Sequence, residues 1–303
     1  MKISVSPSLL ILAGSILWGT GGVFILTAAH YGSTPELTGF LRILFSFLIL
    51  LPVCLFRSGL RGLSLPPRGL FVCALLGILC QGLYNIFYNE AVTRIGMTGS
   101  AVLLNLAPFV AASASFLLFG ERQTLRKTAA ILSCTAGCFL TVTGGVFSPA
   151  ELPLTGILFG IGAGVSYGMT SVLGKLAGKS CDVFAMSLWS YFFAALFLFF
   201  RCDPLAEADL LTAPILLTGF LFALIPTVIA YLLYYEGVVR LEENSRVPVL
   251  ASAETITAAV IGILFFGDPI DPVRFLGIVL TAGSALAMAG QSCLSDSIKK
   301  RLR

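Results

Sequence analysis

Long apolar runs with almost no charge inside them are the feature that most constrains how this chain can fold. A membrane-spanning helix needs roughly 20 mostly apolar residues, and ten such runs follow one another, joined by short connections rich in Gly, Pro and charge. The runs are continuous and do not alternate at period two, which favours helices over a closed barrel. A helix also satisfies its own backbone polar groups in lipid. We therefore predict an all-α integral membrane protein with ten transmembrane helices.

The charge content supports this class. Only 11% of the 303 residues are charged and 57% are hydrophobic, whereas soluble domains carry roughly 25% charged residues. The first run continues past Ala29, which is too long for the apolar core of a cleavable signal peptide. With boundary errors of a few residues, the expected spans cover about 8–29, 36–56, 69–90, 97–119, 126–145, 153–175, 183–200, 213–236, 247–266 and 273–292.

Lysine and arginine residues predict the orientation, because they accumulate in cytoplasmic loops. With the N-terminus inside, fifteen fall on the cytoplasmic side and only three, Arg94, Arg201 and Arg274, fall outside. Both termini are therefore expected in the cytoplasm of a cell whose inner (plasma) membrane holds the protein. The net charge of +4 reflects a basic cytoplasmic tail at 293–303 that lies near anionic lipid, and no nucleic-acid partner is expected.

One polar signature occurs twice. "NIFYNEAVTRIG" begins at Asn85 and "YLLYYEGVVRLE" begins at Tyr231, and their matching Tyr, Glu, Val and Arg residues lie 146 positions apart. "PFVAASASFLLFGE", from Pro108, matches "TITAAVIGILFFGD", from Thr255, at an offset of 147. We predict two five-helix repeats, 8–145 and 153–290. Because five is odd, the second repeat is inverted in the membrane, which is typical of secondary transporters.

Several short motifs occur in a fixed order: "LWGTGGV" in the first run, Arg42 in the second, and the "GE" and "GD" ends of the fourth and ninth runs. In these motifs, and over nearly its whole length, the chain resembles EamA-type transporters of the drug/metabolite transporter superfamily. The resemblance implies transport of metabolites such as amino acids, often as export. No cofactor is expected.

Polar residues inside the third span are candidates for substrate binding. Gln81, Tyr84 and Asn85 share a helix face, and Tyr231 lies on the matching face of the eighth span. Polar side chains within a membrane normally face the bundle interior or a water-filled cavity, so these faces predict the walls of one central cavity. The alternative is that they act only as hydrogen-bonded contacts between helices.

Glu254 is the most unusual ionisable residue, since it lies eight residues into the ninth span from Val247, about 11 Å deep by helical rise. Three roles fit it: a proton-coupling site, a group that binds a substrate amine, or a buried structural partner of a donor across the bundle. Trp18 and Tyr167 hold matching positions in the first and sixth spans. They, and Asn105 near Pro108, are further substrate-binding candidates, although aromatic residues within spans more often pack.

Charged residues near the span ends are expected to form structural ion pairs. Glu90 precedes Arg94 by four residues, and Glu236 precedes Arg240 by four, so each pair can form by helical spacing. Arg42 lies about 9 Å into the second span by helical rise. It can snorkel to the outer interface, where Glu90 is a possible partner; direct anion binding is the alternative.

These features predict a secondary active transporter of small organic metabolites that works by alternating access between two inverted repeats. A flippase for lipid or lipid-linked substrates is the main alternative. An intramembrane enzyme would need paired acids, a Ser/His set or metal ligands at one depth, and the single histidine, His30, argues against a metal site. No ATP-binding P-loop is present. Ten spans can enclose a cavity within one chain, so a monomer is plausible and a homodimer remains open.

Overall fold

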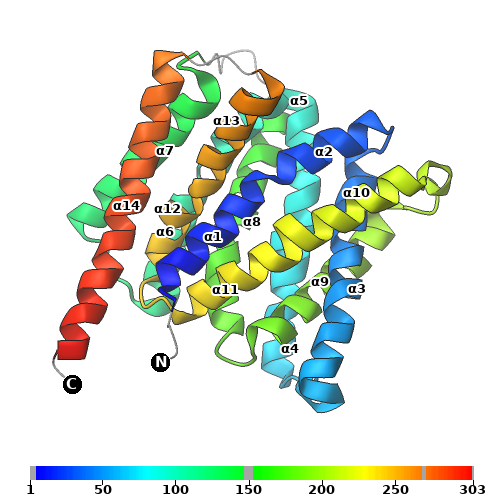
Figure 1. Ribbon diagram of the computed structural model, residues 1–303, viewed down its shortest axis with the longest axis horizontal. Helices are drawn as coiled ribbons and strands as arrows, with labels where there is room; N and C mark the ends of the chain where they lie inside the picture. The colour runs from blue at the N-terminus through cyan, green and yellow to red at the C-terminus, as the bar shows by residue number, and fades with distance from the viewer. Residues whose placement is uncertain (1–4, 147–152, 268–270, 302–303) are drawn as a thin grey trace.

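The computed structural model describes residues 5–146, 153–267 and 271–301, which form a bundle of helices with no strand among them (Figure 1). The helices of the first half are α1 (Pro7–Gly19), α2 (Gly21–His30), α3 (Pro35–Gly62), α4 (Pro67–Gly77), the π-helix η1 (Ile78–Leu83), α5 (Tyr84–Leu104), α6 (Ala107–Phe119) and α7 (Leu125–Thr143).

The second half repeats this order. Its helices are α8 (Leu154–Ala177), α9 (Val183–Cys202), the short 3-10 helix η3 (Ala208–Leu210), α10 (Ala213–Ala223), the π-helix η4 (Leu224–Ile229), α11 (Ala230–Arg240), the 3-10 turn η5 (Asn244–Arg246), α12 (Val247–Ala251), α13 (Ala253–Phe266) and α14 (Pro272–Arg301). The start of α1 and the end of α14 lie at the same edge of the bundle (Figure 1).

Local sequence explains where many of these helices begin and end. The side chains of Thr124 and Asp182 accept hydrogen bonds from the backbone N–H three residues on, and so cap the N-termini of α7 and α9. Gly120, Gly144 and Gly267 end α6, α7 and α13 with φ values of 66°, 61° and 71°. This left-handed conformation is easy only for glycine.

Nine helical stretches among the described residues are long and apolar enough to cross a membrane, and Ala107–Phe119 is a shorter apolar helix. One stretch, Pro67–Leu104, has 38 residues, or roughly 57 Å at helical rise, nearly twice the thickness of a bilayer's hydrocarbon core. It leaves helical geometry at Gly96, where φ is 74°. The division into a third and a fourth span at this break, and hence the count of ten, remains a prediction.

Helices of the two halves pack against one another in symmetric pairs. α1 lies against α11, and α8 lies against α5. These two contacts are equivalent, because α1 and α8 begin the two repeats and α5 and α11 follow the two π-helices. α3 packs on α9 and α7 on α14, which are pairs of equivalent helices. This pairing is the one expected for two repeats related by a two-fold axis, with the core between them.

The contact between α7 and α14 depends on glycine. A Cβ atom added to Gly137 would lie 2.8 Å from the carbonyl oxygen of Gly277, and one added to Gly277 would lie 2.7 Å from the carbonyl oxygen of Gly137. The two backbones therefore touch directly, as small residues allow in membrane helix pairs.

The two π-helices are equivalent as well. Residues 78–83 and 224–229 are both π-helical and lie 146 positions apart, the offset of the repeated polar signature. Thr227 fills the widened turn by donating its hydroxyl hydrogen to the carbonyl oxygen of Phe222 at 2.9 Å. Gln81 is its counterpart in the first half. Single π-turns inside membrane or soluble helices often occur at functional sites.

Candidate functional site

Aromatic rings from both halves converge at the middle of the bundle. The ring centroid of Trp18 on α1 lies 4.7 Å from that of Tyr231 and 4.5 Å from that of Tyr234, both on α11. It lies 6.2 Å from the ring of Tyr167 on α8, which is in turn 5.8 Å from Tyr84. We call these five residues the aromatic cluster. Four of them are residues that the sequence marks as substrate-binding candidates, and the structure brings them together.

Glu254 lies beside the aromatic cluster. The Tyr167 hydroxyl donates to Oε2 of Glu254 at 2.5 Å, which joins α8 to the first turn of α13. One turn residue, Ser252, separates α12 from α13, and its backbone keeps right-handed helical angles, φ −62° and ψ −10°. Glu254 is half-buried. Its carboxylate therefore lies within the predicted ninth span and contacts the aromatic cluster through Tyr167.

Arg42 reaches the same region from α3. Its guanidinium lies 5.3 Å from the ring centroid of Phe222, and the residue is only 9% exposed. Its charge acts on the Glu254 carboxylate and on the phenols of Tyr84 and Tyr231. Within the described residues no carboxylate lies within ion-pair distance of Arg42. The expected partner, Glu90, contacts Arg94 instead.

One polar atom of the aromatic cluster, Nε1 of Trp18, is buried without a hydrogen-bond partner in the described part of the chain. Gln81 is completely buried on η1, and its side chain is hydrogen-bonded to the Tyr231 phenol. Buried polar groups are nearly always hydrogen-bonded, so the unpaired indole N–H requires an explanation.

The two asparagine candidates lie at the margin of this arrangement. Asn85 accepts a hydrogen bond from Asn89 at 3.1 Å, and its amide lies against Gly39 of α3. Asn105 donates to the carbonyl oxygen of Ala101 at 3.1 Å, within its own helix. The described contacts of Asn105 are therefore local and do not join it to Glu254.

The end-of-span pairs occur as helical spacing predicts. Nη2 of Arg94 lies 2.9 Å from Oε2 of Glu90, with both side chains more than a third exposed. Arg240 contacts Glu236 in the same way in the second half. Exposed pairs of this kind contribute little, about 0.3–0.5 kcal/mol each, and they lie away from the aromatic cluster.

A denser polar network lies near one end of the bundle. The Glu121 carboxylate accepts hydrogen bonds from the backbone N–H groups of Asn244 and Ser245, at 2.7 and 2.9 Å. Lys175 lies 3.3 Å from the same carboxylate. The Asn244 amide, fully buried, also donates to the Ser115 hydroxyl at 3.0 Å. We call Glu121, Lys175, Asn244 and Ser245 the clasp.

Glu121 is held in its charged form by its partners in the clasp. Burial by itself would raise the pKa of the Glu121 carboxyl, but the backbone N–H groups of Ser245 and Asn244 and the charge of Lys175 outweigh burial and hold that pKa below its ordinary value. Sequence reasoning did not identify the clasp, although the "GE" end that carries Glu121 is one of the quoted repeat motifs.

The counterpart of Asn244 in the first half, at the repeat offset of 147, is Met97, which is 62% exposed whereas Asn244 is 0% exposed. The counterpart of Glu121 at the same offset is Asp268, which lies outside the described residues. The start of the ninth predicted span is thus held by a carboxylate of the first repeat.

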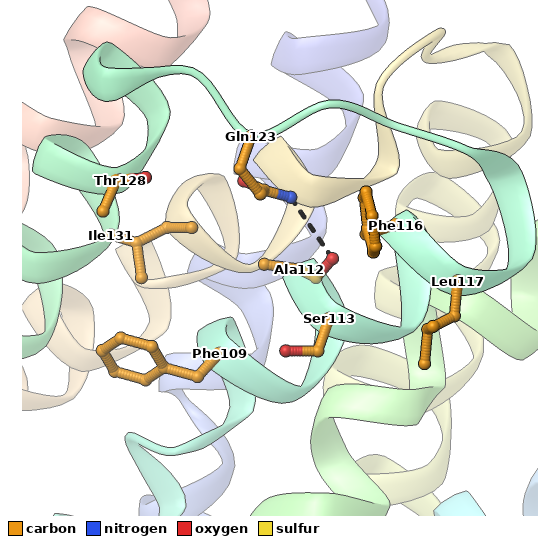
Figure 2. Close-up of a pocket in the computed structure, with 8 residues that line it drawn as sticks. All are labelled: Phe109, Ala112, Ser113, Phe116, Leu117, Gln123, Thr128 and Ile131. Atoms are coloured by element: carbon orange, nitrogen blue, oxygen red, sulfur yellow. Dashed lines mark hydrogen bonds between the residues drawn. The ribbon is translucent and has the colours of Figure 1, made fainter.

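A separate pocket lies on the outer surface, between α6 and α7, with a volume of about 380 Å³ (Figure 2). It is lined by Phe109, Ala112, Ser113, Phe116, Leu117, Gln123, Thr128 and Ile131. Gln123 donates to the carbonyl oxygen of Ala112 at 3.3 Å across its rim. No charged side chain and no predicted site residue lines this pocket. Over the described residues, no group of three or more His, Cys, Asp or Glu side chains could hold a metal ion.

Comparison with known proteins gives consistent matches along the chain. Residues 5–143 and 154–290 each match the EamA-like transporter family. The chain is 26% identical over 297 residues to "Uncharacterized transporter YwfM" of Bacillus subtilis, covering 97% of this chain and 95% of that protein. It is 28% identical over 285 residues to an "Uncharacterized transporter" of Archaeoglobus fulgidus, covering 91% and 94%. A solved crystal structure aligns with a TM-score of 0.79 at 20% identity, over 94% of this chain and 99% of that one, which shows a shared fold.

Proposed function

The chain belongs to the EamA-like transporter family, and from this membership we propose that it is a secondary active transporter of a small organic solute resembling an amino acid. The family match and the apolar helices establish that the protein is a multi-pass membrane transporter and not an enzyme. The substrate class, the mechanism and the orientation belong to the proposal.

The observation that carries the proposal is the hydrogen bond between Tyr167 and Glu254 inside the aromatic cluster. Its surroundings are contributed by both repeats, through Trp18 and Tyr84 of the first and Tyr231 of the second. A solute bound at this junction would touch elements that move relative to each other when one repeat rocks against the other. Aromatic faces would hold its apolar part, and Glu254 would bind an amine or carry a coupling proton.

The clasp supports alternating access. It joins the Glu121 carboxylate at the end of the first repeat to the backbone at Asn244 and Ser245 in the second. We infer that the described conformation is closed at the clasp end and that transport requires the clasp to open. The arginine and lysine bias assigns the clasp end, together with both termini, to the cytoplasm of a plasma membrane.

Lipid flipping is the less favoured alternative. Flipping would require a lipid-facing site with a polar part for a head group, yet the outer pocket between α6 and α7 is lined by no charged side chain. The polar groups that lack partners lie inside the bundle instead.

Transport in proteoliposomes tests the proposal. Purified protein is reconstituted, and uptake and efflux of labelled amino acids are measured under imposed pH and membrane potentials. We expect saturable movement of at least one amino acid, abolished in Trp18→Ala, with Phe56→Ala, which changes a 92% exposed side chain, as the control. A folded protein that moves no amino acid under any gradient overturns the proposed substrate class.

A further inference from the structure

Arg42 is a buried charge for which the described chain supplies no opposite charge at close range. Taking an arginine out of water is costly unless it is paired with an opposite charge, and the residue is only 9% exposed. The guanidinium makes a cation–π contact with Phe222, at 5.3 Å from the ring centroid. Such a contact offsets only part of the desolvation cost.

Glu254 is the nearest candidate counter-charge, and it is occupied elsewhere. Its Oε2 accepts the Tyr167 hydroxyl hydrogen, and the carboxylate is too far from Arg42 to form an ion pair, although each charge acts on the other. Tyr84 and Tyr231 are acted on by both charges. Both opposite charges therefore act on the same two phenols.

An unpaired donor lies in the same region. Nε1 of Trp18 has no hydrogen-bond partner in the described chain, and Tyr231, whose ring contacts Trp18, lies within the field of Arg42. An anion placed here would meet a guanidinium and an indole N–H, which are donors that carboxylates accept. A cationic group of the same ligand, placed beside Glu254, would contact Oε1 of its carboxylate, since Oε2 accepts from Tyr167. It would also contact the faces of the aromatic rings.

We infer that Arg42 is the anion-binding residue of this site and that Arg42 and Glu254 together select a zwitterion: the substrate's carboxylate binds Arg42 and its ammonium binds Glu254. This inference rests on the proposed function, because it assigns a ligand to the same site. Under this inference Arg42 determines substrate specificity, whereas the sequence predicted that it pairs with Glu90 in a structural ion pair.

Three matched probes test the assignment: phenylalanine, phenethylamine, which lacks the carboxylate, and 3-phenylpropionate, which lacks the ammonium. The chain has two tryptophans, so a Trp189→Phe background leaves Trp18, inside the cluster, as the only indole reporter. Fluorescence titration of purified protein then gives a Kd for each probe. We expect phenylalanine to bind more tightly than either half-molecule.

The variants separate the two charges. Arg42→Gln should weaken phenylalanine and 3-phenylpropionate by about tenfold to a hundredfold, as expected for hydrogen bonds to charged groups, and leave phenethylamine unchanged or tighter. Glu254→Gln should weaken phenylalanine and phenethylamine and spare 3-phenylpropionate. Arg94→Gln, at the exposed Glu90 pair, is the matched control and should change none of the three.

Equal weakening of all three probes in Arg42→Gln, unchanged binding of 3-phenylpropionate, or no saturable binding of any probe by the parent protein would each overturn the inference. The result is separable from transport. If the probes show the expected pattern but proteoliposomes move no amino acid, the proposed function fails and the zwitterion site stands. If transport occurs and Arg42→Gln transports with an unchanged KM, the inference fails and the proposed function stands.

Discussion

The Glu121 carboxylate accepts a hydrogen bond from the backbone N–H of Asn244, 123 positions further along the chain, at 2.7 Å. The bond connects the end of α6 in one repeat to η5, the first turn of the segment Asn244–Phe266 in the other. That segment also carries Glu254, so opening the clasp would free the helix on which the candidate binding carboxylate sits.

We predict that Glu121→Gln loosens the clasp. The amide loses the charge and one of the two acceptor oxygens, which should destabilise the closed end by about 2 kcal/mol and speed amide hydrogen exchange at Asn244 and Ser245 roughly 30-fold. Exchange mass spectrometry of the peptide around these residues measures this. Glu90→Gln, at the exposed Arg94 pair, is the control, and unchanged protection in Glu121→Gln would contradict the role of the clasp.

The clasp should also respond to acid. Because the pKa of folded Glu121 lies below its ordinary value, its stabilisation is fully present above that ordinary value, about 4.3, and is lost as the pH falls through the lower folded-state pKa. Thermal unfolding followed from pH 7 to pH 3 should show a loss of stability below about pH 4. Glu121→Gln should be less stable at pH 7 and lose less on acidification; parallel pH profiles would count against this explanation.

Glu254→Gln should remove the pH dependence of transport if Glu254 is the coupling group. The amide can still accept from the Tyr167 hydroxyl, which now donates at 2.5 Å, but it cannot exchange a proton. Initial rates in proteoliposomes between pH 5.5 and pH 8.5 measure this. Tyr167→Phe keeps the carboxylate and removes only the hydrogen bond, so it should retain pH dependence with a shifted midpoint. An unchanged profile in Glu254→Gln excludes the coupling role.

Gly277→Ala should destabilise the packing of α7 on α14. The added methyl would lie 2.5 Å from the backbone nitrogen of Thr141 and 2.7 Å from the carbonyl oxygen of Gly137, so the helices must separate, at about 1–3 kcal/mol. Gly283→Ala on the same helix meets nothing within 4 Å and is the matched control. We expect a lower melting temperature in detergent for the first variant only; equal melting temperatures would show that the helices adjust freely.

The sequence predicted the fold class and the family because these depend on patterns spread over the whole chain. Apolar runs predict helices from their length alone, and both the all-α membrane fold and the EamA family membership are confirmed. The break at Gly96 lies in the connection that the sequence predicts between the third span, 69–90, and the fourth, 97–119.

The candidate site was only partly predictable. Helical spacing places Gln81 and Tyr84 near one face, but it cannot say which residues of other helices face them. Arg42 is the example: by depth alone it fits an interfacial pair with Glu90, and only the packing of α3 on α9 and α10 brings it to Phe222 and Tyr231. The clasp escaped notice because its donors are backbone N–H groups, which every residue carries.

The paired π-helices carry a record of the chain's origin. A π-turn forms when one residue is inserted into an α-helix, and here the insertions occupy the same register, at residues 78–83 and 224–229. One insertion in an ancestral half, copied when that half was duplicated, accounts for both. On this history the widened turn is older than the two-repeat protein, and Gln81 and Thr227 are the residues by which its two copies now differ.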